Sequence, residues 1–187
     1  DPSMGTGGDF AAIQVFELPT FEQVGEWHHN MTPMNQQVRI LQGINKHIHD
    51  AIIERDSSAS PQIFYSMENN TIGEAALMRV MDIGEENIVG MFLSEPIRKG
   101  HRRKFRRGFN TTAKHKIDAC TKFKELVESG KMKINSQLLI SELKDFVATG
   151  LSYKAKPGQH DDLVMSCLLM TRMMKVLADF DPKIFEK

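Results

Sequence analysis

His160-Asp161-Asp162-Leu163-Val164-Met165-Ser166 places two adjacent carboxylates at the head of a long apolar segment near the C-terminus. From Leu163 onward, apolar side chains recur at spacings of three and four, the period of one buried helix face. The members of this stripe are Leu163, Cys167, Met170, Met174 and Leu177. Asp161 and Asp162 are therefore expected in the first helical turn, where unpaired N–H groups and the helix dipole favour acids. The pair alone fits a helix cap as well as one side of a metal site.

Other acids stand at the ends or edges of strand-like runs. Asp1 and Asp9 bracket a glycine-rich turn that leads into the apolar run 10–16, and Glu68 closes the run 62–68. Carboxylates delivered from strand ends and a helix start converge readily on one face of a sheet, where hard oxygen ligands suit Mg²⁺ or Mn²⁺. Two such ions stabilise the attacking and leaving oxygens of a phosphodiester displacement. The acids therefore point to phosphoryl chemistry.

Three motifs in this order resemble the nuclease domain of tailed-bacteriophage large terminases, and the T4-like viruses look most similar. They are Asp-x-Ser-x-Gly-x-Gly-x-Asp (Asp1 to Asp9), a strand ending in Glu before Asn-Asn-Thr-x-Gly (Glu68 to Gly73), and His-Asp-Asp-Leu-Val-Met-Ser (His160 to Ser166). The resemblance implies an α/β fold, an RNase H-like mixed β-sheet flanked by helices on both faces. It also implies a metal-dependent endonuclease that cuts concatemeric double-stranded viral DNA during genome packaging.

Site residues follow from the resemblance by motif. It implies that Asp1, Glu68 and Asp162 are catalytic and hold one or two Mg²⁺ or Mn²⁺ ions for two-metal hydrolysis of low sequence specificity. Asp161 is the alternative to Asp162, and Asp9 is a further metal-ligand candidate.

Two points at this site stay open in the sequence. His160 is an auxiliary candidate that contacts a water or the scissile phosphate, with a hydrogen bond to nearby backbone as the alternative. In the family the first acid ends a central strand, whereas this sequence begins at that acid. If nothing precedes Asp1, we expect a sheet without its middle strand and a less firmly held Asp1.

The resemblance also implies partners and a setting. We expect double-stranded DNA, an N-terminal packaging ATPase domain absent from this chain, a portal protein and a small terminase subunit, in the host cytoplasm at the procapsid portal. No run is apolar and long enough to span a membrane. The 187 residues, 41% hydrophobic, suffice for one sizeable core, so we expect a single nuclease domain over 1–187.

Charge is segregated along the chain, although 24 basic and 24 acidic residues give a formal net charge of zero. Residues 98–116 contain no acid, and glycines at 100 and 108 favour a loop or hairpin in the first half of this segment. Such a loop neutralises phosphates without reading sequence, although solvated charge runs and partner-binding arms have the same composition. We expect Phe105 and Phe109 to pack this loop down rather than stack on a base.

A second turn-rich segment, 149–158, predicts either a hairpin beside the site or a plain connector. The residues predicted to contact DNA in these two segments are Arg102, Arg103, Lys104, Arg106, Arg107, Lys114, Lys116, Lys154 and Lys156.

Periodicity and turn residues predict the remaining elements. The expected strands are 10–18 and 21–28 as an antiparallel pair, 62–68, 88–93 and a short edge strand 132–134. The expected helices are 33–54, 71–81 with Thr71 as its cap, 113–128, one capped by Ser136, and the C-terminal helix. This order suits a mixed sheet covered on both faces.

Two other functions stay open. One is another RNase H-like nuclease, such as a junction resolvase or an RNA–DNA hybrid cutter. The other is a DNA-gripping module of a packaging motor that does not cleave and whose acids only cap and fold. No phosphate-loop lysine motif occurs, so this chain is not expected to hydrolyse ATP by itself.

Overall fold

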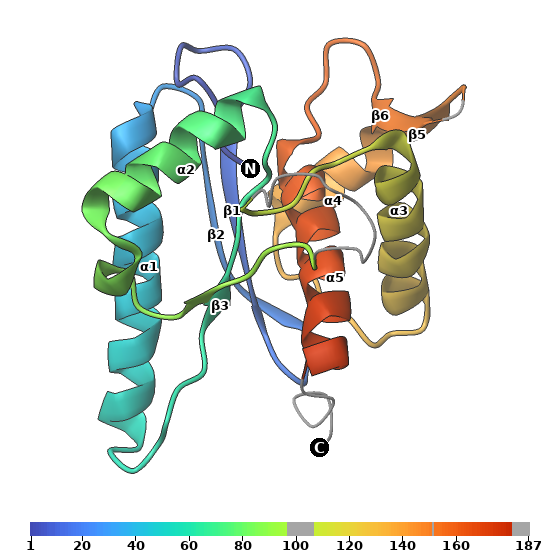
Figure 1. The fold of residues 1–187 in the computed structure, drawn as a ribbon. Helices are drawn as coiled ribbons and strands as arrows, with labels where there is room; N and C mark the ends of the chain where they lie inside the picture. Colours follow the sequence, from blue (N-terminus) through green and yellow to red (C-terminus); the bar gives the residue numbers. More distant parts are fainter. Residues whose placement is uncertain (97–106, 151, 181–187) are drawn as a thin grey trace.

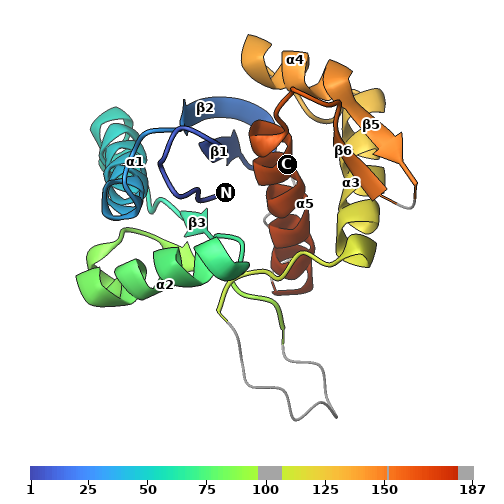
Figure 2. The same cartoon turned by 90° about the horizontal axis from the view of Figure 1, so that it is seen from above.

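The computed structural model describes residues 1–96, 107–150 and 152–180 and places strands between two groups of helices (Figure 1). Helices α1 and α2 lie on one side of the strands, and α3, α4 and α5 lie on the other (Figure 2). The strands are β1 (Ala11–Glu17), β2 (Glu22–His29), β3 (Phe64–Tyr65), β4 (Met91–Phe92), β5 (Phe146–Thr149) and β6 (Ser152–Ala155). The helices are α1 (Met34–Arg55), α2 (Thr71–Ile83), α3 (Ala113–Glu128), α4 (Gln137–Asp145) and α5 (Asp162–Phe180), with a 3₁₀ turn η1 (Glu85–Asn87). The expected α/β class, with helices on both sides of the strands, is confirmed.

The described strands form three two-stranded sheets rather than one continuous mixed sheet. β1 and β2 are antiparallel, as predicted, with an irregularity between Val15 and Phe16, and β3 pairs with β4 in parallel. β5 and β6 form an antiparallel hairpin, so the hairpin interpretation of segment 149–158 is confirmed and the plain connector is wrong. The predicted edge strand 132–134 is reduced to a single parallel bridge between Lys133 and Glu22.

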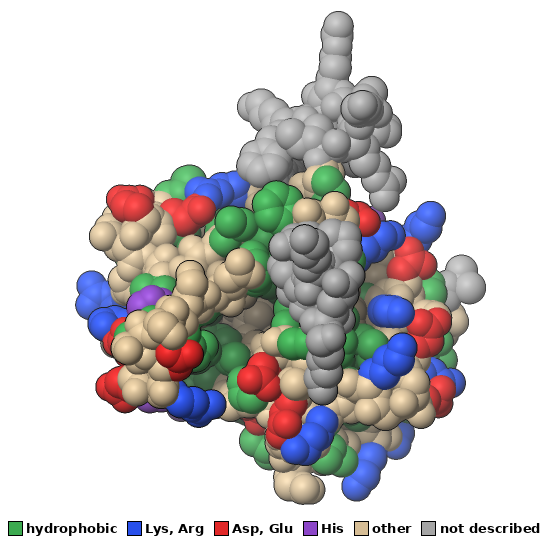
Figure 3. Space-filling view, turned by 90° about the horizontal axis from the view of Figure 1, so that it is seen from below, with side chains coloured by type: hydrophobic (Ala, Val, Ile, Leu, Met, Phe, Trp, Pro, Cys, Tyr) green, Lys and Arg blue, Asp and Glu red, His purple; other side chains and the backbone are tan. Residues whose placement is uncertain are grey.

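An apolar groove of about 840 Å³ lies between β1 and β3 and is also lined by residues of α1 and α5. Seen from below, a hollow with hydrophobic side chains opens on this face of the molecule (Figure 3). Within the described residues no strand pairs β1 with β3, so the groove separates the β1–β2 sheet from the β3–β4 sheet.

Asp1 lies at one end of this groove and pairs with the free edge of β1. The α-amino group of Asp1 donates to the Ala12 carbonyl at 2.8 Å, and the Ala12 amide donates to the Asp1 carbonyl, also at 2.8 Å. Such a reciprocal pair is the closely spaced unit of an antiparallel ladder. The backbone of Asp1 is therefore well held beside β1.

The core on the α3, α4 and α5 side is built around α5. Leu163, Val164 and Cys167 are fully buried, and Leu139 of α4 packs with them. α5 lies between β1 and the helices α3 and α4, which explains why its buried surface is wider than the single stripe in the sequence. Among the described residues no helix is long and apolar enough to cross a membrane.

Candidate active site

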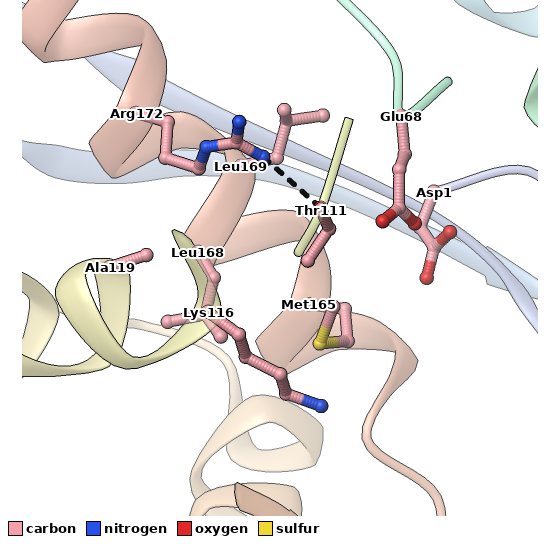
Figure 4. A pocket seen from close by; sticks show the side chains of 9 residues that line it. All are labelled: Asp1, Glu68, Thr111, Lys116, Ala119, Met165, Leu168, Leu169 and Arg172. Carbon is pink, nitrogen blue, oxygen red and sulfur yellow. Dashed lines mark hydrogen bonds between the residues drawn. The ribbon is translucent and has the colours of Figure 1, made fainter. Parts of the chain in front are cut away.

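Two of the three predicted catalytic acids share one small pocket. Asp1 and Glu68 line it together with Thr111, Lys116 and Arg172, and their carboxylates lie side by side (Figure 4). The charges of Glu68 and Asp162 both act on the backbone nitrogen of Asp1. Asp162 therefore lies within electrostatic reach of Asp1. The three acids come from three separate parts of the chain.

Glu68 is positioned by its backbone neighbours on two sides. The Phe109 amide donates to the Met67 carbonyl at 3.2 Å, and the Asn69 amide donates to the Phe109 carbonyl at 2.7 Å, so residue 109 extends the ladder beside Glu68. Asn70 donates to the Glu68 carboxylate at 3.0 Å.

The same Asn70 caps helix α2. Its side-chain oxygen accepts from the Gly73 amide at 2.7 Å, whereas the sequence had suggested Thr71 as the cap. Thr71 is instead the first helical residue. One asparagine thus fixes both the helix start and the side chain of Glu68, which gives the Asn-Asn-Thr-x-Gly motif its structural meaning.

Asp162 is the first residue of α5, and its side chain is 13% exposed. The Phe10 amide donates to its carboxylate at 3.3 Å. Burial raises the pKa of Asp162, and the Phe10 hydrogen bond and the charge of His160 oppose the shift. A half-buried carboxylate with one hydrogen bond is destabilised as an anion until a cation arrives.

Asp161 has a different role in the structure. Its carboxylate accepts from the Ala155 amide of β6 at 3.1 Å and lies 3.8 Å from the Lys116 ammonium. Its carbonyl accepts from the Met165 amide at 2.8 Å, which begins helix α5. Asp161 therefore ties the β5–β6 hairpin to the helix start, while Asp162 is the one held beside Phe10.

The remaining predicted residues lie around Asp162. The charge of Asp9 acts on Asp162, but the side chain of Asp9 is exposed. His160 places its Nδ1 atom 3.6 Å from the Asp162 carboxylate and meets the edge of the Phe10 ring at 4.9 Å. The side chain thus faces the acid.

The donor set is suited to a hard divalent cation, because Asp1, Glu68 and Asp162 supply only carboxylate oxygens. Within residues 1–96, 107–150 and 152–180, however, no three ligating side chains are close enough to form a complete metal site. The acids thus fit Mg²⁺ or Mn²⁺ in kind, and a full coordination shell requires them to move closer together.

The predicted DNA-contacting residues divide into three groups. Arg102, Arg103, Lys104 and Arg106 lie outside the described residues, as does Phe105. Lys114 and Lys154 are exposed. The other three are in ion pairs: Arg107 with Glu85, Lys116 with Asp161, and Lys156 with Asp145.

Phe109 packs as predicted, since it is 1% exposed. Arg107 pairs with Glu85, and its guanidinium lies 5.2 Å from the ring centroid of Phe92. These two contacts hold this residue of the basic segment in place.

Residues 1–173 match the model of the terminase RNase H-like domain family. The chain belongs to this family. The fold is therefore RNase H-like, and its role is of the nuclease type in viral DNA packaging, with DNA and the packaging machinery as partners. Domains of this fold generally use divalent metal ions.

Arg172 is a residue of this terminase domain that sequence reasoning missed. Its side chain, 12% exposed, pairs with Glu95 and donates to the Asn110 carbonyl and the Thr111 hydroxyl, each at 3.1 Å. It also lies 5.1 Å from the ring centroid of Phe109. One guanidinium thus joins Glu95, just before the basic segment 98–116, to Asn110 and Thr111 within that segment. The available signal was an arginine inside the apolar pattern of the last helix.

Glu142 of α4 was also missed. Its carboxylate is 10% exposed and accepts from the amides of Leu163 and Val164 at 2.9 and 3.1 Å, so it caps the helix that carries Asp162. His28 lies 3.8 Å away. Burial raises the pKa of Glu142 from its usual 4.5 to about 7. Nothing in the local sequence marks this acid, because its partners come from a distant helix.

The raised pKa of Glu142 predicts a stability that decreases with pH. The folded state binds this proton more tightly than the unfolded state, so stability falls as pH rises from about 4.5 to about 7. The variant Glu142→Gln keeps an acceptor for the two amides and removes the ionisation. We expect it to differ from the wild type by less than about 1 kcal/mol at pH 5 and to be more stable by about 1 to 3 kcal/mol at pH 8.

Urea unfolding in EDTA at pH 5 and pH 8 measures this difference. Glu54→Gln, in the exposed last turn of α1, serves as the control and should show no such pH-dependent difference. A variant Glu142→Gln that is less stable than the wild type at pH 8 contradicts the prediction.

Proposed function

We propose that residues 1–187 form one metal-dependent endonuclease domain, of the T4-like type, that cuts concatemeric double-stranded viral DNA during packaging. Family membership and one geometric observation support this proposal. Asp1 and Glu68 line the same pocket, and the charges of Glu68 and Asp162 both act on the backbone nitrogen of Asp1.

In the proposed mechanism, Asp1, Glu68 and Asp162 hold one or two Mg²⁺ or Mn²⁺ ions, with Asp161 and Asp9 as outer acids. Bound there, such ions supply an activated water and neutralise charge on the leaving oxygen of a phosphodiester. The protein's own residues place that chemistry: Asn70 and Phe109 fix Glu68, and the Phe10 amide orients Asp162. His160, beside Asp162, is proposed as an auxiliary contact to water or phosphate.

Low sequence specificity follows from the proposed DNA contacts. Arg172, which lines the pocket, binds Asn110 and Thr111 of the basic segment, and Asp161, the neighbour of Asp162, binds the β5–β6 hairpin. In sequence, the two segments carry the basic side chains proposed to contact DNA: Arg102, Arg103, Lys104, Arg106, Arg107, Lys114, Lys154 and Lys156. Such side chains contact phosphates and carry no base readout, so binding should weaken steeply with salt.

The physiological setting is likewise a proposal from the family. Cutting would be restrained from outside this domain, by a packaging ATPase domain, a portal protein and a small terminase subunit at the procapsid portal in the host cytoplasm.

Conversion of supercoiled plasmid to linear fragments tests the proposal. We expect cutting with Mg²⁺ or Mn²⁺, none with EDTA, fragments without a preferred site, and a higher melting temperature with Mn²⁺ because only the folded state gathers the acids. A four-way junction and an RNA–DNA hybrid are compared with linear duplex. Cutting restricted to either of them favours the other RNase H-like nucleases, and metal-dependent DNA binding without cutting favours the gripping module.

A further inference from the structure

Lys116 of α3 lines the pocket that also contains Asp1 and Glu68. Its side chain is 16% exposed, which is low for a lysine. The aliphatic stem runs past Leu168 and ends beside Met165 (Figure 4). A lysine stem packed on apolar side chains carries its charge to a defined place, in contrast to a freely moving surface lysine.

The ammonium of Lys116 is only partly satisfied there. Within the described part of the chain its ion pair is the 3.8 Å contact to Asp161, longer than a hydrogen bond, and the Phe146 ring centroid lies 5.3 Å away. Asp161 already accepts from the Ala155 amide. An ammonium has three donors, so Lys116 keeps donors for a further acceptor.

Arg172 is the other cation that lines this pocket, and its donors, unlike those of Lys116, are bound to acceptors of the protein. Its guanidinium binds Glu95, Asn110 and Thr111, and these contacts hold it in place. Lys116 is thus the cation of the described pocket that retains free donors, and it lines this pocket together with Asp1 and Glu68.

We propose that Lys116 binds a non-bridging oxygen of the scissile phosphate. This inference rests on the proposed nuclease function and separates Lys116 from the basic residues that grip DNA elsewhere. The side chain forms no covalent bond with the phosphate. It neutralises charge on the phosphoryl group as water adds and the bridging oxygen leaves. A positive group aimed at developing charge in a site with little water contributes more than one at an open surface.

Four proteins test this role: the wild type, Lys116→Gln, Lys116→Arg and the control Lys124→Gln. Lys124 lies on the same helix, is 71% exposed and pairs only with Glu128 at 3.7 Å in the described residues, so it has no contact with the pocket. Single-turnover cutting is measured at saturating DNA with Mg²⁺. DNA affinity is measured with Ca²⁺ under conditions where cutting is absent, and the melting temperature is measured with EDTA and with Mn²⁺.

We expect Lys116→Gln to lower the single-turnover rate by about 100-fold, with DNA affinity changed less than about threefold. The melting temperature and its rise with Mn²⁺ should equal those of the wild type, Lys116→Arg should regain most of the rate, and Lys124→Gln should behave as the wild type.

Three results overturn the inference and differ from one another. If Lys116→Gln cuts at the wild-type rate at saturating DNA but binds DNA more weakly, Lys116 is a general DNA contact. A lost Mn²⁺ effect or a large fall in melting temperature makes it a structural partner of Asp161. If the wild type does not cut at all, the proposed function fails together with the inference.

Discussion

Replacement of Asp162 by Asn is expected to lower the rate of DNA cutting by about a thousandfold or more, because a metal ligand supports several kcal/mol of transition-state stabilisation. DNA binding should persist, since the proposed phosphate contacts lie on other elements. In EDTA the variant should be at least as stable as the wild type, because the half-buried carboxylate has a pKa that burial raises and gains little from being charged.

The neighbouring acid supplies a matched comparison. Asp161 accepts from Ala155 and pairs with Lys116, so Asp161→Asn should loosen the β5–β6 hairpin and reduce cutting only moderately, by about tenfold. Asp50→Asn, at an exposed ion pair of α1, is the neutral control.

The melting temperature gives a second reading of the same variants. Mn²⁺ should raise it in the wild type and in Asp161→Asn but not in Asp162→Asn. A rise in melting temperature with Mn²⁺ in Asp162→Asn but not in Asp161→Asn would make Asp161 the metal ligand. Full cutting by both variants would remove the two acids from catalysis and point to a contaminating nuclease.

Local signals in the sequence were sufficient to predict most of the helices and strands, and the positions of the acids at their ends. The three-and-four spacing after Leu163, the cap at Ser136 and the antiparallel pair around Pro19 each depend on neighbours within a few residues, and all three are present in the structure. Such features are predictable because their stabilising contacts are short in sequence.

Contacts between distant segments were not predictable in the same way. Glu142 caps a helix that begins some twenty positions later, and Arg172 joins Glu95 to Asn110 across the fold. Their identities suggest only a surface acid and a surface base, because burial and partners are set by tertiary packing. The resemblance favoured Asp162 over Asp161, but their different surroundings could not be predicted, because adjacent residues at a helix start point in different directions. In the structure Asp162 accepts from the Phe10 amide, and Asp161 accepts from the Ala155 amide of β6.

Replacement of Gly73 by Ala is expected to damage both stability and cutting. A Cβ atom at this position would lie 1.8 Å from the carbonyl oxygen of Glu68 and 2.8 Å from its carbonyl carbon. These are backbone atoms of the residue proposed to bind metal, so no rotamer change relieves the overlap. Helix α2 or the Glu68 backbone must shift, and Asn70, which holds both, must lose one of its contacts.

We expect Gly73→Ala to lower the free energy of unfolding by about 3 kcal/mol, at the upper end of the usual penalty for overpacking a tight contact. Cutting measured well below the melting temperature should fall by about 100-fold or more, because a displacement of about 1 Å in a catalytic group has an effect of that size. Loss of cutting in a folded variant separates misplacement of Glu68 from simple instability.

Gly43 in the middle of α1 is the matched control, since a Cβ there meets no atom within 4 Å. Gly43→Ala should raise the free energy of unfolding by about 0.5 to 1 kcal/mol, as alanine does in a helix interior, and leave cutting unchanged. The same substitution would therefore have opposite effects in the two helices. Urea unfolding and plasmid cutting on both variants measure this contrast, and a fully active, stable Gly73→Ala protein would show that the close approach of α2 does not position Glu68.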